Sequence, residues 1–224
     1  RDSNSELPPL LSVLDALRRG PGARLTFISS GGAVYGLPER LAVDESHPTN
    51  PINSYGIMKL AGERHVLAYG AHHGFEARVL RVSNAYGPGQ RVDRGQGVIA
   101  SFLDGAISGR AKPLFGDGLV VRDFIHIDDL TAALVALTRT PQSPRVLNIG
   151  SGIGVSVRSV AALVEEVTGR KLNLLPQPAR PVDVPRIVLD VSLLRQTIDH
   201  DTVDLANGIH LTWRAMRGSL QAAV

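Results

Sequence analysis

The 224-residue sequence contains no cysteine, which excludes disulfide bonds, thiolate metal sites and a cysteine nucleophile. Aromatic residues make up only 4% of the chain, and no basic stripe carries them, so we expect no nucleic-acid binding despite a formal net charge of +3. The seven histidines show no HxxxH or HxH spacing, so no metal site is predicted. The lack of cysteine fits a reducing compartment, and we expect a cytoplasmic location.

Two longer features are also lacking. No apolar stretch approaches the roughly 20 residues that a membrane-spanning helix needs, so no membrane association is expected. No complete glycine-rich dinucleotide loop is found either. Residues 150–154 (GSGIG) follow a predicted strand, but Val155 stands where GxGxxG needs its third glycine, and no acidic residue ends a strand about 20 residues later. We interpret this run as a strand-to-helix turn.

The apolar residues that are present alternate between helical and strand patterns, which is typical of an α/β protein with a parallel sheet. Helical spacing is found over 7–17, over 54–73 with Ser54 as its cap, over 97–109, after a cap at Asp128 or Asp129, over 156–167, near 192 and over 204–217. Strand-like runs cover 24–29, 77–82, 119–127 and 145–149. Glycine and proline breaks indicate one wound sheet and a smaller, interleaved lobe.

The most informative motif is the pair Tyr55 and Lys59, which are four residues apart and therefore share one face of the predicted helix. A free phenol has a pKa of about 10, and a nearby ammonium lowers it by favouring the phenolate. The pair is thus suited to moving a hydroxyl proton. An incidental YxxxK on an amphipathic helix is the alternative.

Polar residues follow the ends of two predicted strands. Ser29 and Ser30 end the first and precede small residues that let a flat ligand approach the backbone, unless they form a plain turn. Asn84 ends the second, where its amide suits either a substrate contact or an Asx turn. Ligands of open parallel sheets bind at this carboxyl edge.

A third motif, residues 122–129 (RDFIHIDD), combines charges with a strand. The planar fork of Arg122 suits a diphosphate. Asp128 and Asp129 are interpreted as either caps or members of an ion pair, and His126 is assigned no role.

Taken together, these residues resemble the NAD-dependent epimerase/dehydratase family of extended short-chain dehydrogenases/reductases, and within it the UDP-glucose 4-epimerases. The runs that carry the resemblance occur in family order along nearly the whole chain. They are residues 27–36 (FISSGGAVYG), 53–59 (NSYGIMK), 81–90 (RVSNAYGPGQ), 115–118 (FGDG), 122–130 (RDFIHIDDL), 147–152 (LNIGSG) and 180–190 (RPVDVPRIVLD).

The resemblance implies a Rossmann-like, doubly wound parallel sheet that lacks its N-terminal strands, with residues 1–88 and 119–150 in an NAD-binding domain. Residues 89–118 and 151–224 would form a nucleotide-sugar-binding lobe. Tyr55 would take the proton of the sugar 4-hydroxyl while hydride passes from C4 to NAD, and Lys59 would hold the cofactor ribose. The family also implies a homodimer.

The remaining roles follow from the same resemblance. Asn84 and Arg122 would bind the diphosphate of a nucleotide sugar, and Arg180 and Asp183 would lie near the nucleotide. The usual catalytic Ser/Thr position falls on Gly31, so Ser30 is the expected substitute, with Ser29 near the cofactor.

Three functions stay open at this stage. The leading one is a nucleotide-sugar 4-epimerase that forms a transient 4-keto sugar. A related NAD(P)-dependent dehydratase or reductase is the second, although small residues stand where family dehydratases carry Asp-Glu. The third is a nucleotide-sugar-binding module without its cofactor loop. Because the first predicted helix resembles the one before the family's fourth strand, we expect weak NAD binding and an exposed sheet edge.

Overall fold

The computed structural model of the chain describes residues 7–20, 22–92, 97–140, 143–180 and 183–221. Its first sheet has three parallel strands in the order β1-β2-β6. They are β1 (Arg24–Ser30), β2 (Glu76–Val82) and β6 (Val146–Ile149). Because the strands are parallel, their carboxyl ends share one edge of the sheet, and Ser30 lies opposite Val82 there.

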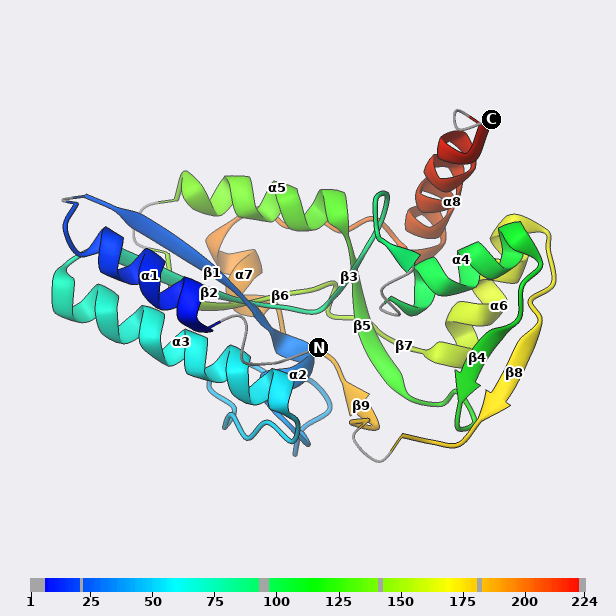
Figure 1. Cartoon of the computed structure of the whole chain (residues 1–224), viewed down its shortest axis with the longest axis horizontal. Coiled ribbons are helices and arrows are strands. Elements are labelled where there is room, and N and C mark those ends of the chain that lie inside the picture. Colours follow the sequence, from blue (N-terminus) through cyan, green and yellow to red (C-terminus); the bar gives the residue numbers. More distant parts are fainter. Residues whose placement is uncertain (1–6, 21, 93–96, 141–142, 181–182, 222–224) are drawn as a thin grey trace.

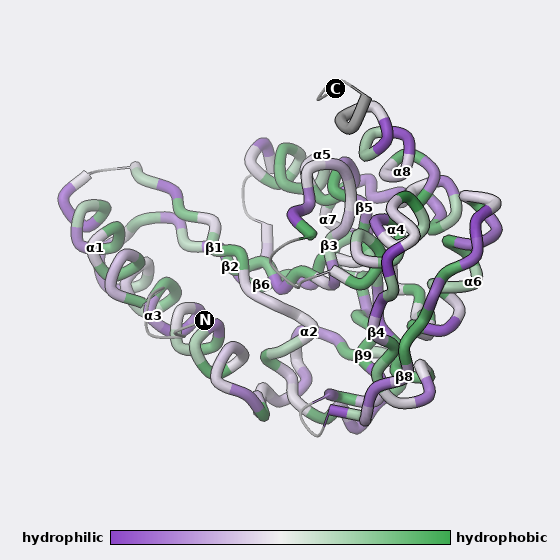
Figure 2. Tube along the Cα trace, turned by 45° about the vertical axis from the view of Figure 1, so that its right-hand side comes forward, coloured by the Kyte–Doolittle hydropathy of each residue, from purple (hydrophilic) through white to green (hydrophobic). Residues whose placement is uncertain are grey.

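Helices cover both faces of this sheet (Figure 1). On one face lie α1 (Leu7–Leu17) and α3 (Ser54–His73), whose Leu14 and Val66 share a buried cluster with Val79 of β2. On the other lie α5 (Ile127–Thr138) and α7 (Ser192–Thr197), which bury Leu137 and Leu194 in the cluster that contains Leu147 of β6. Figure 2 shows the strands running between the two helical layers. The predicted doubly wound α/β fold is therefore confirmed.

The rest of the chain builds a second group of short strands and helices beside the first sheet (Figure 1). One set of strands comprises β3 (Asn84–Tyr86), β5 (Val121–His126), β7 (Gly154–Ser156) and β9 (Arg186–Ile187), and β4 (Lys112–Phe115) pairs separately with β8 (Leu174–Gln177). Three helices, α4 (Val98–Ser108), α6 (Val157–Thr168) and α8 (Leu205–Gln221), complete the group. They share a separate buried cluster centred on Phe102, Val164 and Ile209. The predicted division of the chain into two domains stays a prediction.

Two helix caps differ from the prediction. Asn53, not Ser54, caps α3, because its side chain accepts a hydrogen bond of 2.8 Å from Gly56 N. His126, not Asp128 or Asp129, caps α5, since its Nδ1 accepts from Asp128 N at 3.4 Å. Caps depend on backbone angles at the helix start, and several neighbouring polar residues suit that position equally well.

The edge of the first sheet and the turn after it add two details. β1 is an edge strand of the described sheet, and its Ile28 is 42% exposed. After β1 the chain forms a short helix, α2 (Gly31–Val34), in place of the plain turn that was the alternative. Within the described residues, no helix has the length and apolar character needed to cross a membrane.

Candidate active site

The first part of the site is a corner at the carboxyl edge of the sheet, where Ser30 and Asn84 lie close together. Ser30 precedes α2, but its hydroxyl makes no capping hydrogen bond. A Cβ placed on Gly32 would lie 3.9 Å from Ser30 Oγ and 4.0 Å from Asn84 Nδ2. The two predicted substrate-binding side chains therefore flank the same small space. Asn84 Nδ2 also donates to the carbonyl of Asp123 at 2.9 Å, which fixes the orientation of its amide.

Gly31, the position at which the family pattern expects a hydroxyl, has no room for a side chain. A Cβ there would lie 2.6 Å from Leu189 Cδ1 and 3.1 Å from the carbonyl oxygen of Arg81. Leu189 is itself buried in the core, with 1% of its surface exposed, so it cannot turn away into solvent. The hydroxyl available at this corner is that of Ser30.

Tyr55 and Lys59 lie in the first two turns of α3, on one face as predicted. Lys59 Nζ is 5.7 Å from the centre of the Tyr55 ring and 5.5 Å from that of Phe27. Tyr55 is 48% exposed, so its ring is accessible to a ligand. Its neighbour Gly56 packs on α2, because a Cβ at Gly56 would lie 2.6 Å from the carbonyl oxygen of Ala33. This close approach brings the start of α3 against the corner that holds Ser30.

Ser29 does not face the corner. It is 3% exposed, and its hydroxyl donates to Glu63 Oε1 at 2.5 Å. The Glu63 carboxylate also pairs with Arg81, whose Nη2 lies 2.7 Å from Oε2. The predicted cofactor contact of Ser29 stays untested, but its side chain is already engaged in a buried network that joins β1, β2 and α3.

The same network reaches the third strand through residues that the sequence reasoning missed. Arg81 donates to the Tyr35 hydroxyl at 3.1 Å, and that hydroxyl donates to Asn148 Oδ1 at 2.7 Å. Burial raises the pKa of Tyr35 to about 12, so the phenol stays a donor at neutral pH. The available signal was Glu63, four residues after Lys59 on α3, and therefore on the same face of the helix.

The second part of the site gathers Arg122, Arg180 and Asp183. Arg122 Nη1 donates to the carbonyls of Val121 at 2.9 Å and Val184 at 2.6 Å. Arg180 Nε lies 3.1 Å from Asp183 Oδ2, and its guanidinium stacks 4.2 Å from the centre of the Phe115 ring. Burial lowers the pKa of Arg122, Asp183 opposes that shift, and the positive charge of Arg180 adds to it. Two cations beside one carboxylate leave a net positive site that suits an anion.

The two parts are joined by strand pairing. β3 runs parallel to β5 with Asn84 opposite Phe124, so Asn84 lies two register positions from Arg122. Parallel pairing thus places the corner beside the arginine cluster. Phe115 was missed as a single residue, although residues 115–118 were among the runs that carried the resemblance.

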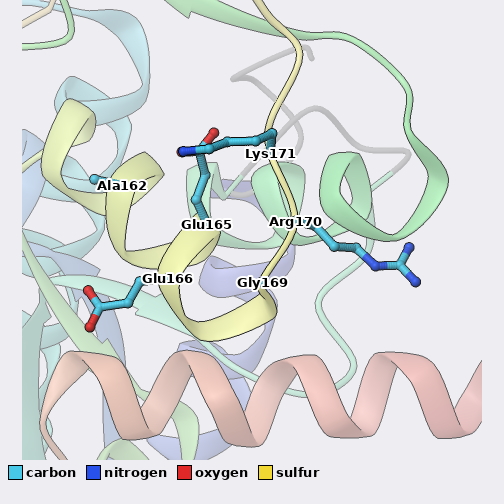
Figure 3. A pocket seen from close by; sticks show the side chains of 6 residues that line it. All are labelled: Ala162, Glu165, Glu166, Gly169, Arg170 and Lys171. Atoms are coloured by element: carbon cyan, nitrogen blue, oxygen red, sulfur yellow. The ribbon is translucent and has the colours of Figure 1, made fainter.

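Two hollows of the surface lie elsewhere. One of about 490 Å³ is formed at the end of α6 and in the segment after it, by Glu165, Glu166 and Lys171 among others (Figure 3). Lys171 Nζ pairs with Glu165 Oε2 at 2.7 Å, and Arg170 donates to carbonyls at the end of α4, so these charges serve the local packing. A second, of about 290 Å³, lies between α4 and α8. Neither includes a predicted site residue.

Comparison with known proteins places this geometry in a family. A sequence model of the NAD dependent epimerase/dehydratase family matches residues 7–150, which is more than half of the chain. The chain belongs to the NAD-dependent epimerase/dehydratase family. The resemblance stated from the motifs is therefore confirmed.

Individual relatives include more than one activity. The chain is 34% identical over 200 residues to a putative UDP-glucose 4-epimerase of Methanocaldococcus jannaschii, covering 89% of this chain and 65% of that protein. It is also 34% identical over 203 residues to a dTDP-glucose 4,6-dehydratase of Streptomyces griseus, covering 90% of this chain and 61% of that one. It thus spans less than two thirds of the length of these relatives.

A solved structure agrees with the fold. The crystal structure of a UDP-glucose 4-epimerase from the hyperthermophilic eubacterium Thermotoga maritima, with UDP-glucose, superposes with a TM-score of 0.91. Its sequence is 30% identical, and the match covers 98% of this chain and 72% of that one. An epimerase fold is therefore shown for nearly the whole chain.

The family cofactor fits the described residues only in part. Tyr55 and Lys59 suit the nicotinamide ribose end of NAD. The turn at 150–152, in contrast, has its backbone N–H groups engaged, because Ser151 N and Gly152 N donate to the Asp123 carboxylate at 2.9 and 3.1 Å. It is a structural turn and not a dinucleotide loop, but the prediction of a strand-to-helix turn is wrong in one respect, because the turn joins β6 to strand β7 and α6 begins only after β7. Within the described residues, no GxGxxG run offers a cradle for the pyrophosphate.

Proposed function

We propose that this family member is an NAD-dependent nucleotide-sugar 4-epimerase that acts through a transient 4-keto sugar. The observation that carries the proposal is the position of Tyr55, an accessible phenol 5.7 Å (ring centre) from the Lys59 ammonium, on a helix packed against the Ser30 corner. NAD, when bound, supplies the oxidation at C4 and its reversal. The homodimer implied by the resemblance and the cytoplasmic location expected from the lack of cysteine stay predictions.

The chain's own residues handle the proton and the sugar. Tyr55 takes the proton of the 4-hydroxyl, and the Lys59 ammonium lies beside its ring on the same face of α3. The Ser30 hydroxyl makes no capping hydrogen bond to α2. It therefore donates to the same sugar oxygen and holds that oxygen in line with the phenol. Asn84, across the space above Gly32, orients the neighbouring part of the substrate.

The nucleotide half of the substrate is assigned to the arginine cluster. Arg122 is half-buried and held by two carbonyls, so its fork is preorganised, and Arg180 is held over Phe115. Asp183 balances only one of the two arginine charges, and a diphosphate would supply the remaining negative charge. Since β3 and β5 are paired, the sugar would point from this cluster toward Ser30.

A dehydratase is the second candidate, because a dTDP-glucose 4,6-dehydratase is among the relatives. Removing water from the sugar needs an additional acid beside the catalytic hydroxyl. Here Gly31 and Gly32 follow Ser30, and Leu189 fills the space beside Gly31. The local structure therefore favours epimerisation.

The test is product analysis by NMR after incubation of the chain with NAD and, separately, UDP-glucose, UDP-galactose and dTDP-glucose. We expect the 4-epimer with no net reduction of NAD. We also expect Tyr55→Phe to abolish turnover while its circular dichroism is unchanged, and the matched variant Tyr69→Phe, lower on the same helix, to keep turnover. Loss of water, net NADH, or an active Tyr55→Phe variant would refute the proposal.

A further inference from the structure

Asp123 carries a buried carboxylate to which the proposed function gives no role. The residue is 1% exposed. Its Oδ1 accepts from Ser151 N at 2.9 Å and Ser151 Oγ at 2.8 Å, and its Oδ2 accepts from Gly152 N at 3.1 Å and Leu189 N at 3.3 Å. Burial raises the pKa of this carboxyl, and the four donors oppose that rise. Such complete coordination indicates that the group holds other segments in place.

Three of the four donors belong to Ser151 and Gly152, and the fourth, Leu189 N, ends the segment that leads from Asp183 to Leu189. Its middle, β9, pairs with β5 so that Ile187 lies opposite Arg122, and Pro185 O accepts from Val121 N at 2.9 Å. Asp123 fixes the far end of this segment through Leu189 N. The near end meets Arg122, whose guanidinium donates to Val184 O at 2.6 Å.

Asp123 and Arg122 are consecutive in β5, so their side chains leave opposite faces of the strand. The carboxylate is therefore not a partner of the arginine and acts on it through the neighbouring segment. The main-chain carbonyl of Asp123 also accepts from Asn84 Nδ2 at 2.9 Å. One residue thus supports both Asn84 and the strand that brings Asp183 and Arg180 to Arg122.

We propose that Asp123 is a positioning residue for the nucleotide diphosphate, which keeps segment 183–189 registered on β5 and thereby holds the Arg122 cluster in a binding arrangement. This inference rests on the proposed function, because it assumes that the cluster binds the diphosphate. Space around the carboxylate is tight, since a Cβ on Gly150 would lie 2.5 Å from Asp123 Oδ2. Small changes at position 123 should therefore reach the segments that it holds.

The test variant is Asp123→Asn, which keeps the shape but replaces one acceptor oxygen by an NH₂ group that faces backbone N–H donors. We expect the dissociation constant for UDP, measured by calorimetry, to rise at least tenfold. Uridine, which lacks the phosphates, should bind within threefold of the wild-type value in an NMR titration. A purely structural role would weaken the binding of UDP and of uridine alike. That result, or unchanged affinities for both ligands, would overturn the inference.

Two further variants control for folding. Asp128→Asn makes the same chemical change at a side chain that is 75% exposed, and it should leave UDP binding within twofold of wild type. Ser151→Ala removes one of the four donors to the Asp123 carboxylate. If Asp123→Asn does not fold, this variant tests the inference in its place. It should weaken UDP binding two- to fivefold with uridine unchanged, and wild-type affinity would count against the inference.

Amide hydrogen exchange on the unliganded protein separates this inference from the proposed function. If the wild-type chain does not bind UDP, the nucleotide assignment fails. In that case Asp123→Asn must still accelerate exchange over residues 184–189 at least tenfold more than over β2. Equal exchange in the two regions would show that Asp123 does not hold the segment.

Discussion

Leu189 Cδ1 would lie 2.6 Å from a Cβ placed on Gly31, so the leucine side chain fills the space that a hydroxyl-bearing residue at position 31 would need. The two residues lie far apart in the sequence, and the segment through Leu189 also forms an isolated parallel bridge with Val43. The contact between Leu189 and Gly31 explains why the corner depends on Ser30 for its hydroxyl.

Gly31→Ala should lower the free energy of unfolding by about 1–3 kcal/mol, because an added methyl overpacks the buried Leu189. Gly32→Ala is the matched control in the same short helix, since its Cβ would meet no atom closer than 3.9 Å. We expect no loss of stability there, because alanine suits a helix better than glycine does. Urea unfolding measures both, and equal stabilities would contradict the packing argument.

Ser29→Ala should lower mainly the stability of the protein, whereas Ser30→Ala should lower mainly its turnover. Removing the buried Ser29 hydroxyl leaves Glu63 short of a donor and should cost about 1–3 kcal/mol of stability. Removing the Ser30 hydroxyl should leave stability within about 0.5 kcal/mol and lower epimerase turnover on the order of 10²-fold. Urea unfolding and product formation, measured on both variants, check the pair. The reverse pattern would assign the substrate contact to Ser29.

Asp104 should make stability depend on acid pH. Burial tends to raise the pKa of this carboxyl, but the Lys112 ammonium, 2.5 Å away, outweighs burial and holds the pKa below its ordinary value. A lowered folded-state pKa contributes stability above the ordinary value of about 4, and this contribution is lost as the pH falls through the folded value. The exposed Arg110 adds little.

Asp104→Asn should therefore be about 1–2 kcal/mol less stable than wild type at pH 7, and the difference should shrink toward zero near pH ~2. Denaturant unfolding at several pH values gives this difference. Asp15→Asn, which removes half of an exposed pair on α1, should change stability by less than about 0.5 kcal/mol at any pH. A stability difference between Asp104→Asn and wild type that grows as the pH falls would contradict a lowered pKa of Asp104.

The elements of the fold were predictable where a local pattern specifies them. The predicted helix over 7–17 matches α1, and the strand over 77–82 matches β2 within one residue. Prediction failed at the caps of α3 and α5, where Asn53 and His126 were overlooked because adjacent serine and aspartate residues suit a cap equally well. The pleat and the helical turn repeat every few residues, whereas a cap depends on one backbone conformation.

The residue types of the site were predictable from the sequence, but most of their hydrogen-bond partners were not. Tyr55 and Lys59 share a face because four residues make about one turn of a helix, and no further information is needed. The burial of Ser29 against Glu63, and the carbonyls that hold Arg122, required knowledge of which elements meet. No spacing in the sequence predicts contacts between residues that lie far apart along the chain and meet only in the folded protein.

The amino-acid order alone determined the alternation of strands and helices, the acid/base pair on α3 and the family motifs, since each depends on neighbours within a few positions. The tertiary structure alone decided that the Ser29 hydroxyl is buried against Glu63, that the turn at 150–152 serves Asp123, and that the carbonyls of Val121 and Val184 hold Arg122. The physical reason is that burial and hydrogen-bond partners are set by packing between distant segments, and this packing decides which polar groups are left for a ligand.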